Sequence, residues 1–94
     1  MKNDQEKLAY IVQSLIEPKD FPSLRGILGM WDNNVLRLSF VFERPFNNTL
    51  LEDAAVLATE ILSQYPNGLV KDKYLHLQAN HKLPKSPYWV FRKN

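Results

Sequence analysis

The 94-residue chain contains no cysteine, only three glycines and two histidines, and no long apolar run. Without cysteine it has no disulfide, no thiolate metal site and no cysteine nucleophile. No apolar stretch approaches the roughly 18 residues that a transmembrane helix requires. The opening residues, MKNDQEK, are too polar for the apolar segment of a secretory signal. We therefore expect a cytosolic protein with no membrane partner.

The sequence also lacks the usual motifs of catalysis. His76 and His81 lie five positions apart, and neither G-x-S-x-G nor H-E-x-x-H surrounds them. A metal site needs three or four convergent ligands, and Asp72 is the one carboxylate near these histidines in the sequence. We expect no enzymatic activity, no cofactor and no bound metal. The rival hypothesis is a nuclease or hydrolase that uses His76 with a carboxylate.

The composition is that of a packed globule. The chain is 45% hydrophobic and has five Phe, four Tyr and two Trp, which argues against disorder. Its length suffices for one hydrophobic core and not for two. We predict a single domain over residues 1–94.

Charge is distributed unevenly along the chain. Residues 1–64 carry six Lys or Arg and nine Asp or Glu, whereas residues 65–94 carry six basic residues and one acidic residue. The formal net charge of +2 therefore hides an acidic body and a basic tail. Each could steer a different partner, or both could be ordinary solvated surface.

Apolar residues recur at helical spacing over 4–17, which predicts an amphipathic helix that Asn3 or Asp4 caps and Pro18 ends. A strand is expected over 24–31. The next segment, 32–34, has the residues of a turn.

Strict alternation predicts the second strand. One face is expected to be core and the other half-solvated, and the core face carries Leu36, Leu38, Phe40 and Phe42.

A second helix is predicted to start at a capping box formed by Thr49 and Glu52 and to continue to about Gln64. Pro66, Asn67 and Gly68 end it. Its expected buried stripe is Leu51, Ala54, Ala58, Ile61, Leu62 and Tyr65.

A third strand is predicted over 69–79, with a bulge or frayed edge because Lys71 and Lys73 interrupt its alternation. A final strand over 88–93 would place Trp89 and Phe91 on one side. The fold class is therefore α+β, a two-layer sandwich of α-β-β-α-β-β order. Two helices cover one face of a four-stranded, mainly antiparallel sheet, with a core centred on Leu38, Phe40, Phe42, Ile61 and Leu62.

Two surfaces have the chemistry to bind a partner. Glu52 and Glu60 are eight residues apart and share the outer face of the second helix, so they are either solvated or positioned for a basic partner. The C-terminal third interleaves basic and aromatic residues, which is typical of a nucleic-acid surface and also of a protected sheet edge. A small nucleic-acid-binding domain is therefore the alternative function.

Three stretches of the chain resemble a known family: LRGILGMWD, VLRLSFVFE and EDAAVLATEILSQYP, together with YWVFRK near the end. The pattern covers residues 24–66 and 88–93. It resembles the immunity proteins of contact-dependent growth inhibition and related bacteriocin-like systems. The matching positions are Arg25, Trp31, Asp32, Arg37, Glu52, Asp53, Glu60, Tyr65 and Arg92.

The resemblance implies a bacterial, cytosolic protein that binds and inhibits a cognate toxin C-terminal domain, expected to be of nuclease type. The partner-binding residues it suggests are Asp32, Glu52, Asp53 and Glu60, with Trp31 as an aromatic anchor. Three features depart from the pattern: Gly26 and Ile27 replace a small-apolar pair, Thr59 replaces an acidic residue, and the C-terminal third is basic. Neither the identity of the toxin nor the oligomeric state follows from the sequence.

Overall fold

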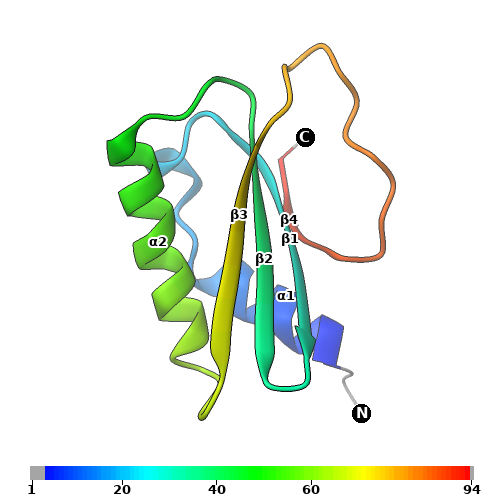
Figure 1. The fold of residues 1–94 in the computed structure, drawn as a ribbon. Coiled ribbons are helices and arrows are strands. Elements are labelled where there is room, and N and C mark those ends of the chain that lie inside the picture. Colours follow the sequence, from blue (N-terminus) through cyan, green and yellow to red (C-terminus); the bar gives the residue numbers. More distant parts are fainter. Residues whose placement is uncertain (1–3, 94) are drawn as a thin grey trace.

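The computed structural model describes residues 4–93 and forms two helices and a four-stranded sheet (Figure 1). A short 3-10 turn, Pro18–Asp20, joins the first helix to the first strand. The observed order agrees with the predicted α+β arrangement. The elements are α1 (Asp4–Leu15), β1 (Leu24–Asp32), β2 (Val35–Phe42), α2 (Asn48–Leu62), β3 (Leu69–His76) and β4 (Trp89–Arg92).

The sheet is mixed, with strand order β3-β2-β1-β4. β1 is antiparallel to β2, as the predicted hairpin requires, and also to β4, whereas β3 runs parallel to β2 instead of antiparallel. The parallel pairing follows from the connection between these two strands. Because α2 carries the chain back to the end of the sheet where β2 began, β3 must run in the same direction as β2.

Both helices lie on one face of the sheet, and the core fills the space between the layers (Figure 1). Four residues predicted to centre the core are at most 1% exposed, which confirms the prediction for Leu38, Phe40, Phe42 and Ile61. Leu62, the fifth, is only half-buried. Of the predicted stripe of α2, Ala54, Ala58 and Ile61 are buried, as is Tyr65 just beyond the helix. Leu51 is half-buried like Leu62, and Leu57 is buried although it was not predicted.

The hairpin between β1 and β2 is tighter than predicted. Asp32 belongs to β1 and pairs with Val35, so only Asn33 and Asn34 form the turn. Their φ angles are 50° and 63°, which is the left-handed geometry of a type I′ hairpin. Asn tolerates this conformation better than most residues do, which explains the Asn pair at this point.

The predicted capping box of α2 is wrong. Asn47 caps the helix instead, because its extended backbone lets its Oδ1 accept a hydrogen bond from the Leu50 N–H at 2.9 Å. Thr49 and Glu52 both lie inside the helix. At the other helix, α1 ends at Leu15, two residues earlier than predicted, and the proposed Asn3 cap lies outside the described residues.

The two C-terminal strands also differ from prediction. β3 pairs with β2 without any register shift and ends at His76, opposite the last residue of β2, so it has neither the expected bulge nor an extension to residue 79. The irregularity lies in β4: Leu28 pairs with Trp89 and Ile27 with Phe91, which leaves Val90 as the extra residue. The side chains of Trp89 and Phe91 therefore lie on opposite faces.

Candidate functional site

An acidic groove runs along the outer surface of the helical layer, between α2 and the segment that joins α1 to β1. Its volume is about 470 Å³. Both apolar side chains and carboxylates line it. The lining residues are Leu15, Glu17, Asp20, Phe21, Asp53, Val56, Leu57 and Glu60.

The α2 wall of this groove is one flank of the helix. Asp53, Val56, Leu57 and Glu60 follow one another at spacings of three, one and three residues, which places them in adjacent turns on the same side. Leu57 is buried, whereas Val56 is 58% exposed and offers apolar surface between two carboxylates. The wall can therefore contact a partner through both charge and apolar area.

The opposite wall contributes Glu17 and Asp20, on either side of the break at Pro18. Within residues 4–93, none of the four carboxylates of this groove has an ion-pair partner, and no basic side chain lines it. Glu17 and Asp20 were not among the predicted binding residues. The signal in the sequence was the presence of an acidic residue on each side of a helix-ending proline.

The structure brings together only two of the five predicted partner-binding residues, Asp53 and Glu60. Glu52 is exposed on α2 but does not line the groove, and Asp32 is exposed beside the hairpin turn. Trp31 is half-buried, because its ring stacks on Tyr65 with the ring centroids 4.4 Å apart. The five residues therefore do not form one contiguous site.

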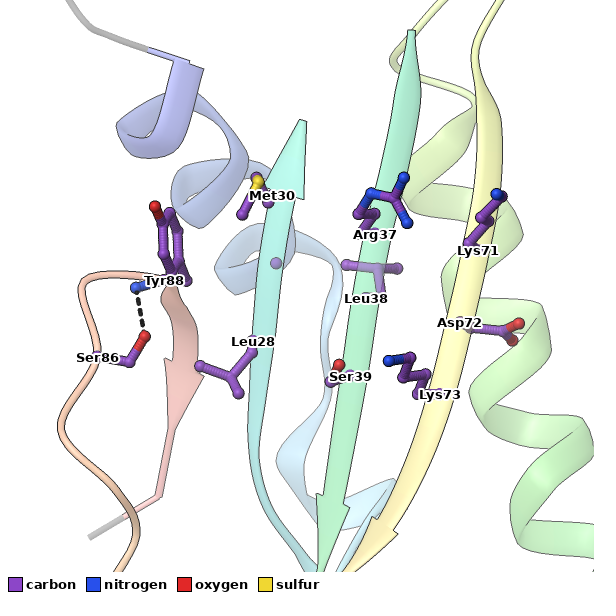
Figure 2. Close-up of a pocket in the computed structure, with 11 residues that line it drawn as sticks. Leu28, Met30, Arg37, Leu38, Ser39, Lys71, Asp72, Lys73, Ser86 and Tyr88 are labelled. Carbon is purple, nitrogen blue, oxygen red and sulfur yellow. Dashed lines mark hydrogen bonds between the residues drawn. The ribbon is translucent and has the colours of Figure 1, made fainter. Parts of the chain in front are cut away.

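A second candidate site is the face of the sheet that the helices leave open. A trough of about 320 Å³ crosses β1 and β2 there (Figure 2). The side chains of Leu28 and Met30 line its apolar part. Three cations, Arg37, Lys71 and Lys73, come from β2 and β3.

Strand alternation explains why these side chains share the open face. Leu36 and Leu38 are buried toward the helices, so Arg37 between them points the other way. Lys71 is the register partner of Arg37 and therefore lies on the same face. The lysines that were predicted to interrupt β3 instead form the regular outward half of its alternation.

Neither candidate site has the constellation of an enzyme centre. His76 ends β3 and His81 lies in the following loop, and neither lines the groove or the trough. Across residues 4–93 there is no group of three or more His, Asp or Glu side chains placed to hold a metal ion. Nor does the described part of the chain contain a helix long and apolar enough to cross a membrane.

The whole described fold, from α1 through β4, falls within one sequence family. The family model described as MafI2 immunity protein matches residues 5–94. No curated protein matches the chain. The match spans both helices and all four strands and confirms the resemblance to small bacterial immunity proteins of toxin systems. The chain therefore belongs to the MafI2 immunity protein family.

Proposed function

We propose that this immunity protein neutralises a cognate toxin domain in the cytosol by binding it through the acidic groove. Membership of the family implies toxin neutralisation and a toxin protein as the partner. The finer claims are that the toxin is a nuclease of contact-dependent growth inhibition type and that the protein acts without catalysis. The groove is the observation that supports them.

The sign of the groove matches what a nuclease would present. An enzyme that binds a nucleic-acid backbone exposes basic side chains around its substrate site. Glu17, Asp20, Asp53 and Glu60 together form a complementary acidic margin. Such complementarity accelerates association and disfavours wrong partners, while the exposed Val56 supplies apolar contact.

Inhibition of this kind requires no reaction centre. A rigid surface that occupies or covers the toxin is sufficient, because binding alone keeps the substrate away. The groove has such a surface, since α2 is held to the sheet by Ala54, Leu57, Ala58 and Ile61.

Titration calorimetry with the cognate toxin domain tests this proposal. The double variant Asp53→Lys/Glu60→Lys should weaken binding at least ~30-fold, the equivalent of losing about 2 kcal/mol at an interface centre. Glu52→Lys is a control for charge reversal on the same helix, because this carboxylate is exposed but does not line the groove. Thermal melts of all variants verify that they remain folded.

Two results would contradict this proposal. If Glu52→Lys weakens binding as much as the double variant does, the outer face of α2 is the interface. If co-expression of the wild-type protein fails to rescue growth of cells that produce the toxin domain, neutralisation itself is wrong.

A further inference from the structure

We propose that the open face of the sheet is a second protein-binding surface, which takes an acidic, amphipathic segment of a partner protein. This goes beyond the proposed function, because it concerns the opposite layer of the molecule and a partner of opposite charge. The helices cover one face of the sheet, while the other face keeps the trough described above (Figure 2).

One wall of the trough is the end of the loop over residues 77–88, and hydrogen bonds fix it in place. The Gly29 N–H donates to the Tyr88 carbonyl oxygen at 2.9 Å, and the Tyr88 N–H donates to the Ser86 hydroxyl oxygen at 3.1 Å. The Trp89 indole N–H donates to the Pro84 carbonyl oxygen at 2.9 Å. The wall is therefore part of the folded structure, and Tyr88 remains 42% exposed on it.

The other wall is cationic. Arg37 and Lys71 are register partners on adjacent strands, and Lys73 follows two residues later on the same face. Two residues of strand span about 6.6 Å, so the three cationic side chains form a cluster of neighbouring positions on the sheet. Their like charges repel one another, and a nearby anion would relieve that repulsion.

This cluster is not neutralised within the part of the chain that the structure describes. The side chains of Arg37, Lys71 and Lys73 make no ion pair or hydrogen bond there. Asp72, between the two lysines, also lines the trough, but its carboxylate points away from it in Figure 2. Its carboxylate accepts a hydrogen bond from the Tyr74 hydroxyl instead. The charge of the trough therefore remains available to an external anion.

The dimensions suit one segment of polypeptide. The trough lies between β3 and β4, which are three strand spacings apart, about 14 Å between backbones. An extended strand or a single helix of 10–12 Å diameter fits that width. Its apolar side chains would contact Leu28 and Met30, and its carboxylates would meet Arg37, Lys71 and Lys73.

A protein segment suits this surface better than a nucleic acid does. Non-specific binding of single strands uses a basic track along the backbone and several stacking aromatics. Here the cations form one cluster, the central lining of Leu28 and Met30 is aliphatic, and Tyr88 is the one aromatic residue that lines the trough. Nucleic-acid binding is accordingly the competing outcome of the test.

Amide chemical shifts of the ¹⁵N-labelled protein test the proposal during titration with a synthetic dodecapeptide of glutamate and leucine, with leucines at helical spacing. We expect saturable shifts on the trough segments of β1, β2 and β3. A peptide with lysine in place of glutamate should cause none. The variant Arg37→Glu/Lys71→Glu should bind the acidic peptide at least ~10-fold more weakly, and Met30→Ser at least ~3-fold.

Lys82→Glu/Lys85→Glu is the matched control, because it changes the net charge equally at exposed loop positions that do not line the trough. Equal weakening in this control would show a general charge effect and overturn the proposal. The absence of saturable shifts with the acidic peptide would overturn it too. Tighter binding of a twelve-residue oligo-dT, with the same dependence on Arg37 and Lys71, would identify the face as a nucleic-acid surface instead.

Discussion

The acidic groove of the helical layer and the basic trough of the sheet are built alike and charged oppositely. Each is lined by apolar side chains together with charged ones. The groove obtains its carboxylates from helical spacing on α2 and from the segment around Pro18, while the trough obtains its cations from strand alternation on β2 and β3. Opposite faces of one small fold thus present opposite charges.

This difference shows that the charge of each site follows from its place in the fold more than from its position in the sequence. Arg37 belongs to the acidic first two thirds of the chain, yet it lies on the basic face beside Lys71. A net charge of +2 describes neither surface. A basic partner and an acidic partner can each select one face.

Loss of the shared core should abolish both faces together. Phe40 is fully buried in the core between the sheet and the helices. Phe40→Ala should therefore lower the free energy of unfolding by about 3–5 kcal/mol. Urea denaturation measures this, with Val56→Ala as an exposed control that should change stability by less than about 0.5 kcal/mol. A loss below about 1 kcal/mol for Phe40→Ala would remove Phe40 from the core.

A methyl group added at Gly29 should overpack the core on the face of the sheet that the helices cover. A Cβ added at Gly29 would lie 3.0 Å from Leu8 Cδ2 and 3.2 Å from both Leu38 Cδ2 and Val90 Cγ2. All three neighbours are buried, so Gly29→Ala should cost about 1–2 kcal/mol by overpacking. A double-mutant cycle with Leu8→Ala should show a favourable coupling above about 0.5 kcal/mol; independent effects would contradict the contact.

The start of α2, which carries one wall of the groove, depends on its cap. Asn47→Ala should cost about 1 kcal/mol, because the Leu50 N–H loses its acceptor. Asn47→Asp should retain most of the stability. Thr49→Ala tests the capping box directly: if it destabilises the protein more than Asn47→Ala does, Asn47 is not the cap.

The smallest expected effect on stability concerns Tyr74, which lies on the edge strand β3. Burial, followed by the hydrogen bond to Asp72 and the charge of that carboxylate, raises the pKa of Tyr74 above its ordinary 10.0. The folded protein then holds this proton at a pH where the unfolded chain has lost it, so stability is fully present below about pH 10 and falls as the pH rises further.

Unfolding free energies measured between pH 8 and 11 check this prediction. The slope above about pH 9 should be shallower in Tyr74→Phe than in the wild type. Burial, and then the charge of Asp4, raises the pKa of Tyr65 as well. Tyr65→Phe should therefore also make the dependence of stability on pH shallower, independently of Tyr74. Identical slopes in wild type and Tyr74→Phe would refute a role for Tyr74.

Local patterns in the sequence predicted the elements that tertiary contacts did not override. The alternation of β2 placed Leu36, Leu38, Phe40 and Phe42 in the core, where all four are buried. The apolar spacing of α1 and α2 predicted two helices. The sequence did not identify the cap of α2, because Asn47 and Thr49 are both good capping residues. Only the backbone conformation distinguishes them.

The sequence analysis placed Glu52 and Glu60 on one outer face of the second helix, whereas the groove is lined by Asp53 and Glu60, seven residues apart on one helix flank. Their partnership with Glu17 and Asp20 joins residues more than thirty positions apart along the chain and depends on how α1 and α2 pack. The predicted role of Trp31 as an anchor did not foresee that its ring would stack on Tyr65.

The sequence by itself therefore determined the α+β class, the face of β2 that is buried, and membership of an immunity protein family, since these depend on short-range periodicity and on recognisable motifs. Only the tertiary structure decided the parallel pairing of β3 and the bulge at Val90. It also decided the gathering of Arg37, Lys71 and Lys73 opposite an acidic groove. These features arise from contacts between distant segments, whose energies depend on register and packing and leave no periodic signal in the chain.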